Sequence, residues 1–141
     1  MSEQPGSPRY SIDDWVRKAE QDYRAAAKLA PDDTPDVVCF LCHQCVEKYL
    51  KALITRAGSE PGRTHDLIGL IEQLQDGGGL RGEAISALDV LDGFAVVVRY
   101  PGAYADEEDA RGALAAVRIM RNAARRLLRL DDEEHDEDDD V

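Results

Sequence analysis

The chain has 141 residues, 43% of them hydrophobic, which is enough for one domain with a single packed core. Its formal net charge of −12 argues against a uniformly basic surface for nucleic acid. No apolar run approaches the roughly 20 residues that span a bilayer, and the first ten residues lack the basic and apolar regions of a secretion signal, so we expect a cytoplasmic protein.

The acidity is concentrated near the C-terminus. Residues 131–140 contain nine acidic side chains, and the rest of the chain holds 20 acidic and 17 basic residues, a net charge of −3. We therefore expect a flexible N-terminus over residues 1–10, a helical domain over residues 11–130 and a disordered acidic tail over residues 131–141. The tail is either a solubilising segment or a mimic of nucleic acid that covers a basic face of this protein or of a partner.

Helical periodicity dominates the domain and predicts an all-α fold, an up-and-down bundle of four to five helices. Ser11 is a good N-cap for the first helix, which we expect to run to about Leu29. A loop rich in proline and aspartate follows over residues 31–36. The second helix runs from about Asp36 to Ala57, and its apolar arc is wide enough for the centre of a bundle.

Three further helices complete the expected fold. Thr64 caps a shorter helix, which ends at the three glycines of residues 77–79. A fourth helix covers about residues 80–98, and a Pro-Gly pair forces a turn within residues 99–104. The last helix covers about residues 106–130. Its closing turns carry five arginines suited to the negative end of a helix, at positions 118, 121, 125, 126 and 129.

Three cysteines, Cys39, Cys42 and Cys45, lie on the second helix and invite comparison with a zinc site. At roughly 100° and about 1.5 Å per residue, Cys39 and Cys45 lie about 120° apart around the helix and about 9 Å apart along it, so the three thiols do not converge on one ion. Their odd number is also a poor disulfide framework. We expect buried thiols, and neither a metal nor another cofactor.

Polar residues of the second helix form a first candidate site. Steps of three and four place Gln44, Glu47, Lys48 and Lys51 along adjoining rows of one face, beside His43, and Glu47 and Lys51 are spaced as an ion pair. One interpretation is a solvated face with a salt bridge that contributes a few tenths of a kcal/mol. The other is a polar seam that borders a cleft or a dimer interface.

Two loops supply further candidates. Thr64 and His65 stand at the start of the third helix, where Thr64 suits a cap and His65 suits a general acid or base, or a phosphate contact. Arg99 ends the fourth helix and suits an anion contact or a helix cap. Tyr100 and Tyr104 beside it could stack on a base.

These segments, taken together, resemble the HEPN family. The sequences HQCVEKYLKALI (residues 43–54), RTHDLIGLI (residues 63–71) and VRYPGAY (residues 98–104) are similar to the three signature blocks of that family, in the same order. The first helix, WVRKAEQDYRAAAKL, also resembles the family's first helix. The resemblance covers about residues 12–130.

The resemblance implies a fold of about five helices, a symmetric homodimer and a polar cleft where helices meet. Family members are often encoded beside a minimal nucleotidyltransferase as toxin–antitoxin pairs. Many are metal-independent ribonucleases, and others bind nucleotides without cleavage. The matching residues imply a nucleotide or RNA site formed by His43, Gln44, Glu47, Lys48, Lys51, Thr64, His65, Arg99, Tyr100 and Tyr104.

The ribonuclease members share an arginine followed, after a gap of four to six residues, by a histidine. Here Arg99 is followed after four residues by Tyr104, and a phenol keeps its proton at neutral pH. Arg129 and His135 match the spacing only formally, because His135 lies among the acidic residues.

We therefore predict a nucleotide- or RNA-binding module, partnered by a nucleotidyltransferase, whose catalysis is weak or absent. Its Lys48, Lys51, His65 and Arg99 should converge on one cleft. The alternatives are an active ribonuclease that uses Arg99 with His65, and a dimerisation or scaffold domain.

Overall fold

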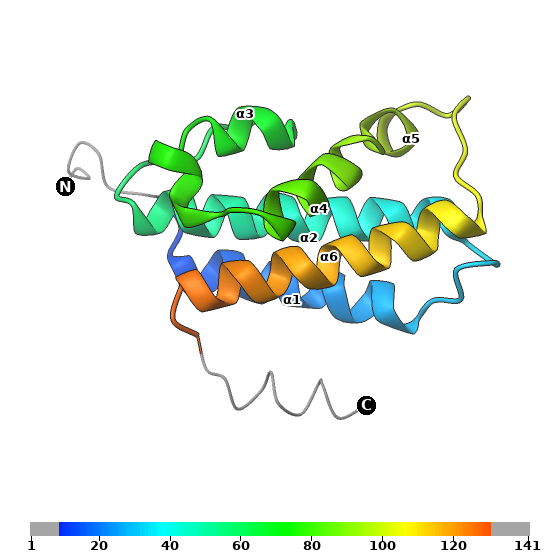
Figure 1. Ribbon diagram of the computed structural model, residues 1–141, viewed down its shortest axis with the longest axis horizontal. Coiled ribbons are helices and arrows are strands. Elements are labelled where there is room, and N and C mark those ends of the chain that lie inside the picture. Colours follow the sequence, from blue (N-terminus) through cyan, green and yellow to red (C-terminus); the bar gives the residue numbers. More distant parts are fainter. Residues whose placement is uncertain (1–8, 131–141) are drawn as a thin grey trace.

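The structure is a computed structural model that describes residues 9–130 (Figure 1). The predicted acidic tail and most of the predicted flexible N-terminus lie outside these residues. The described part is all-α, as predicted. Its elements are α1 (Ile12–Lys28), α2 (Pro35–Arg56), α3 (Leu67–Ile71), the 3₁₀ helix η1 (Gln75–Gly79), α4 (Glu83–Asp92), α5 (Ala95–Arg99) and α6 (Glu107–Leu127).

Capping boxes fix the starts of α1 and α6. The Asp14 N–H donates to the Ser11 hydroxyl at 3.0 Å, and the Ser11 N–H donates back to the Asp14 carboxylate at 2.9 Å. Asp106 and Asp109 make the same reciprocal pair at 2.8 and 3.0 Å. Each box satisfies two N–H groups that a helix start would otherwise leave unpaired. Both helices therefore begin where the sequence predicts.

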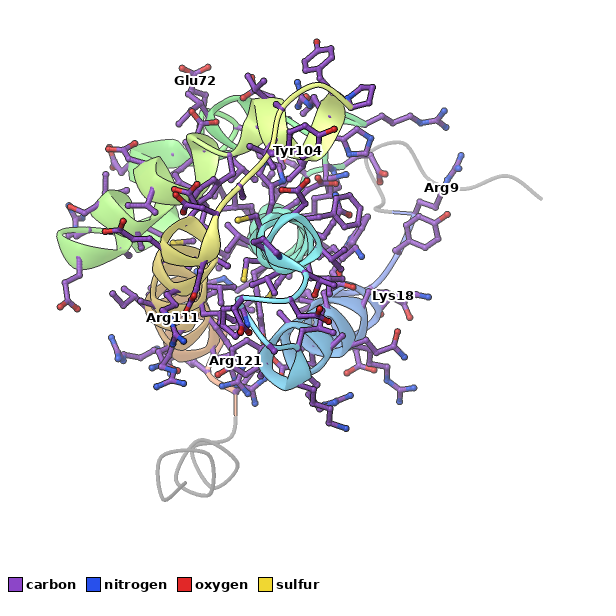
Figure 2. All side chains as sticks on the ribbon, turned by 90° about the vertical axis from the view of Figure 1, so that its right-hand side faces the viewer. Arg9, Lys18, Glu72, Tyr104, Arg111 and Arg121 are labelled. Atoms are coloured by element: carbon purple, nitrogen blue, oxygen red, sulfur yellow. The ribbon has the colours of Figure 1, made fainter. Side chains whose placement is uncertain are left out.

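Helix α2 is the centre of the bundle. Figure 2, viewed end-on, shows it between α1 and α6 on one side and the α3–α5 segments on the other. Its largest fully buried side chains include Tyr49, Leu50, Leu53 and Ile54. Because its sides are covered by different helices, apolar residues recur nearly all around it. No helix of the described part is long and apolar enough to cross a membrane.

The three cysteines of α2 are core residues. Cys39, Cys42 and Cys45 are free thiols with no exposed surface. Burial raises the pKa of Cys39 and of Cys42 to about 12, and nearby carboxylates add to the effect at Cys39. These thiols therefore stay protonated and pack as small hydrophobic groups, as predicted.

The third helix is shorter than predicted. Its N-cap is Asp66 rather than Thr64, whose hydroxyl accepts a hydrogen bond from the Asp66 N–H at 3.0 Å before the helix begins. Thr64 thus shapes the loop that carries His65. After α3 the chain passes through η1, where three consecutive glycines have φ values of 64°, 66° and 99°. Side chains disfavour this left-handed backbone, which explains the glycine run.

The continuous fourth helix predicted over residues 80–98 is wrong. The chain instead forms α4 and α5, separated at Gly93 and Phe94. Gly93 closes α4 by donating its N–H to the Asp89 and Val90 carbonyl groups at 3.1 and 3.2 Å. Glycine weakens a helix, and the β-branched residues that follow do little to continue it. The break turns α5 so that it lies against α2 and carries Arg99 there (Figure 1).

Candidate functional site

A buried carboxylate on α2 organises the candidate site. Glu47 is only 3% exposed. Its oxygens accept from the Lys51 ammonium at 3.3 Å, from the Gln44 amide at 3.4 Å and from His65 Nδ1 at 3.0 and 3.2 Å. An ionised carboxylate can only accept, so Nδ1 of His65 carries the proton. The interpretation of this row as a solvated face is therefore wrong.

Helix α1 covers the lysine of this cluster. Lys51 is 7% exposed, and its ammonium lies 5.3 Å from the centre of the Trp15 ring. The Tyr10 ring packs edge-on against Trp15, with 5.5 Å between ring centres. A buried ammonium is costly unless it is paired, and here both Glu47 and an aromatic face stabilise it.

His65 extends from the buried carboxylate to the surface. Its side chain is 65% exposed, against 4% for that of Glu47. Because Nδ1–H is donated to the carboxylate, the ring orientation is fixed and Nε2 is left to accept a hydrogen bond from a ligand. A carboxylate that holds one imidazole nitrogen in this way is the usual means of positioning a histidine base.

His43 lies one turn before Glu47 and is 1% exposed. Neither of its ring nitrogens has a hydrogen-bond partner among the described residues. Burial lowers the pKa of His43, against an opposing effect of Glu47, and the charges of Arg99 and His65 lower it further. The ring is therefore neutral, and it lies within electrostatic reach of both Arg99 and His65.

Tyr104 lies at the end of the molecule that faces the viewer in Figure 2, and Arg99 and Tyr100 precede it at the end of α5. Arg99 is exposed and makes no hydrogen bond or ion pair within residues 9–130. Tyr100 and Tyr104 are 59% and 77% exposed. The Ala105 N–H donates to the Asp36 carboxylate at 2.6 Å and so ties this turn to the start of α2. The turn thus holds one cation and two aromatic rings toward solvent.

Not every predicted site residue joins the cluster. Lys51 and His65 meet at Glu47, and Thr64 shapes the loop of His65. Lys48 instead pairs with Asp22 of α1 at 2.6 Å and helps to hold α1 against α2. Its ammonium is thereby neutralised, so Lys48 is a structural residue here.

A second polar cluster was not predicted. Arg121 donates two hydrogen bonds to Glu20 at 2.7 and 2.8 Å, and its guanidinium lies 4.4 Å from the Tyr23 ring centre. The Tyr49 hydroxyl also donates to Glu20, and Arg125 donates to the Tyr49 oxygen at 3.2 Å. These contacts join α1, α2 and α6.

The environment of this cluster is buried. Arg121 and Arg125 are 3% and 7% exposed, and their contacts with Glu20 and Tyr49 were not expected from positions that suit the negative end of a helix. Burial alone would raise the pKa of Glu20, but hydrogen bonds from Arg121 and Tyr49 lower it below its ordinary value. The four-residue spacing of Arg121 and Arg125, which places both on one side of α6, was the signal in the sequence that could have indicated this cluster.

Comparison with known proteins identifies the family and the fold. Residues 12–127 match the family model described as the HEPN domain. The crystal structure of ST0689, an archaeal HEPN homologue, is similar at 25% identity and a TM-score of 0.63, covering 82% of this chain and 96% of that chain. The crystal structure of TT1696 from Thermus thermophilus has the same fold, at 23% identity and a TM-score of 0.69, covering 82% and 97% of the two chains.

A search of the curated proteins found no match. The family match nevertheless spans most of the chain and nearly all of the described helices. The chain therefore belongs to the HEPN domain family.

Proposed function

We propose that this HEPN protein binds a nucleotide or an RNA end at the face formed by His65, Arg99 and the turn after α5, with weak or no catalysis. The observation that carries this proposal is the buried Glu47, which fixes His65 and leaves Nε2 toward solvent. Burial of this carboxylate is costly even beside Lys51, and its position orients an exposed histidine.

The chemistry of the face suits a nucleotide. The exposed guanidinium of Arg99 can bind phosphate oxygens in a bidentate manner. The exposed rings of Tyr100 and Tyr104 offer stacking surfaces, and stacking of a base on an aromatic side chain contributes about 1–3 kcal/mol. His65 supplies a hydrogen bond to a phosphate or a ribose hydroxyl. These features support binding of one or a few nucleotides rather than of a long duplex.

The same residues argue for weak catalysis. Metal-independent RNA cleavage needs a base for the 2′-hydroxyl and a cation for the charge on phosphorus. Tyr104 stands where ribonuclease members of the family have histidine, and a phenol is a poor base at neutral pH. His43 is buried and cannot reach a substrate. Of the two histidines in the described residues, only His65 remains as a base, so cleavage there depends on its reaching the ribose held by Arg99.

The family suggests the partners. We propose a cytoplasmic homodimer that works with a minimal nucleotidyltransferase in a toxin–antitoxin-like pair. Val37 and Phe40 of α2 and Val96 of α5 are 46%, 43% and 57% exposed, and exposed apolar side chains support a protein contact at this end of the molecule.

A thermal-shift experiment tests binding. The protein is heated with AMP, ATP, GTP or a short single-stranded RNA, beside the variants Arg99→Ala and His65→Ala and the matched control Arg81→Ala, an exposed arginine elsewhere. A ligand at a hundred times its Kd adds about 2.7 kcal/mol, which raises Tm by about 10 °C. We expect this rise for the wild type and the control only. No shift with any ligand at millimolar concentration contradicts the proposal.

A cleavage assay distinguishes an active ribonuclease from a binding module with weak or no catalysis. RNA is incubated with the protein in EDTA, beside Arg99→Ala and His65→Ala. Cleavage by the wild type that both variants lose establishes an active ribonuclease. Cleavage that is equal in all three samples comes from a contaminant, and this result excludes the ribonuclease alternative.

A further inference from the structure

A groove lies between α1 and the C-terminal half of α6, separate from the candidate site. Its volume is about 430 Å³, and its lining includes Asp13, Arg17, Glu20 and Arg24 from α1, Arg125 from α6, and Leu130, three residues after the end of α6. Figure 2 labels Arg121 at this face, on the other side of α2 from the α5 turn. The face therefore belongs to α1 and α6 and shares no residue with the site around His65.

The groove is bordered by basic rows on both helices. Arg17, Arg24 and Lys28 follow one another on α1 at spacings of seven and four, which places them on one side of the helix. Arg118 and Arg125 have the same seven-residue spacing on α6. Arg17 pairs with Asp13 at 3.0 Å, whereas Arg24, Lys28 and Arg118 make no hydrogen bond or ion pair within the described part of the chain.

The described chain ends at the edge of this groove. Leu130 lines it, and the Leu130 N–H donates to the Arg125 carbonyl at 2.9 Å, which closes the last helical turn. The next ten residues contain nine acidic side chains. The most acidic segment of the chain thus begins beside a groove whose lining includes Arg24, which has no partner within the described part of the chain.

We propose that residues 131–140 occupy the α1–α6 groove of their own chain. An extended segment of ten residues reaches about 33–36 Å, and the 17 residues of α1 extend over only about 25 Å. Leu130 lies at the Arg17 end of the groove, so the segment is long enough to run past Arg24 to Lys28. The carboxylates then face the guanidinium groups of Arg24 and Arg118 and the ammonium group of Lys28.

The tether makes such a contact effective. Single exposed ion pairs are weak and are screened by salt. A short covalent link, however, gives the segment an effective concentration in the millimolar range. Phosphates of RNA would seek the same basic rows, so the acidic segment competes with polyanions at this face. This inference does not depend on nucleotide binding near Arg99.

NMR tests the contact directly. Backbone signals of residues 131–140 are compared between the wild-type chain and the triple variant Arg17→Gln/Arg24→Gln/Lys28→Gln, with Lys18→Gln/Arg63→Gln/Arg81→Gln as a control of equal charge. Salt at 0.5 M screens the ion pairs of the wild type and gives the signals of the released segment. We expect the groove variant to give signals close to these without added salt, and the control variant to keep the signals of the wild type at low salt. Identical signals in wild type and groove variant overturn the proposal, as do wild-type shifts that disappear on dilution, which would show docking on a second copy.

A binding assay tests the competition. Anisotropy of a labelled single-stranded RNA is measured with the full chain and with a chain that ends at Leu130. At low salt we expect the shortened chain to bind the RNA about tenfold more tightly than the full chain does. If four cations of the groove contact phosphates, the affinity of the shortened chain should fall about 50-fold between 50 and 200 mM salt. The groove variant should remove this gain. Equal binding by the two chains, or a gain that the groove variant keeps, overturns the proposal.

Discussion

The clearest energetic prediction concerns the buried pair of Glu47 and Lys51. The substitution Glu47→Leu leaves the Lys51 ammonium, whose side chain is 9% exposed, without its carboxylate and with only the Trp15 ring 5.3 Å away. Loss of one partner of a buried pair costs roughly 3–5 kcal/mol. We therefore expect Glu47→Leu to lower Tm by about 15 °C. The double variant Glu47→Leu/Lys51→Met removes both charges and should recover most of this loss.

Urea unfolding followed by circular dichroism at 222 nm measures these free energies. The exposed pair of Glu107 and Arg111 on α6 has the same four-residue spacing, with side chains 48% and 64% exposed, and serves as the matched control. We expect Glu107→Leu to cost less than about 1 kcal/mol. If Glu47→Leu lowers the free energy of unfolding no more than Glu107→Leu does, burial does not make loss of the carboxylate more costly. If the double variant is as unstable as Glu47→Leu alone, the unpaired Lys51 ammonium is not the cause of the loss.

Three further predictions concern buried groups. The pKa of Glu20 is lowered, so its stabilising effect should be lost as pH falls through its folded pKa, and Glu20→Gln should remove that part of the acid dependence of unfolding. The pKa of His43 is also lowered, so stability should fall below about pH 6.5, where the unfolded histidine gains a proton, and His43→Leu should reduce this slope. Cys39, Cys42 and Cys45 should react with a thiol reagent only at the rate of unfolding; rapid reaction of the folded protein would contradict their burial.

Local signals explain which helices could be predicted. The caps at Ser11 and Asp106 lie within three residues of the groups they satisfy, so the starts of α1 and α6 follow from the sequence. The division of α4 from α5 did not follow, because apolar residues continue at helical spacing through Gly93. What decides the break is the packing of α5 on α2, which local spacing does not contain.

The contacts within the candidate site could be predicted only in part. The spacing of Glu47 and Lys51 predicted an ion pair, yet their burial depends on Trp15 of α1 and His65 of the following loop. The cluster around Glu20 was missed for the same reason, since Arg121 is 101 residues away from it in the chain. Contacts of this range are determined by the fold as a whole.

The most direct test of the proposed site follows the histidine ring signals by NMR during titration with a short 5′-phosphorylated RNA or with AMP. The chain has only three histidines, which makes their assignment by substitution simple. We predict that the His65 signal moves and saturates, and that Arg99→Ala abolishes this movement. A His65 signal that stays fixed at millimolar ligand, or one that moves equally without Arg99, contradicts a nucleotide site at this face.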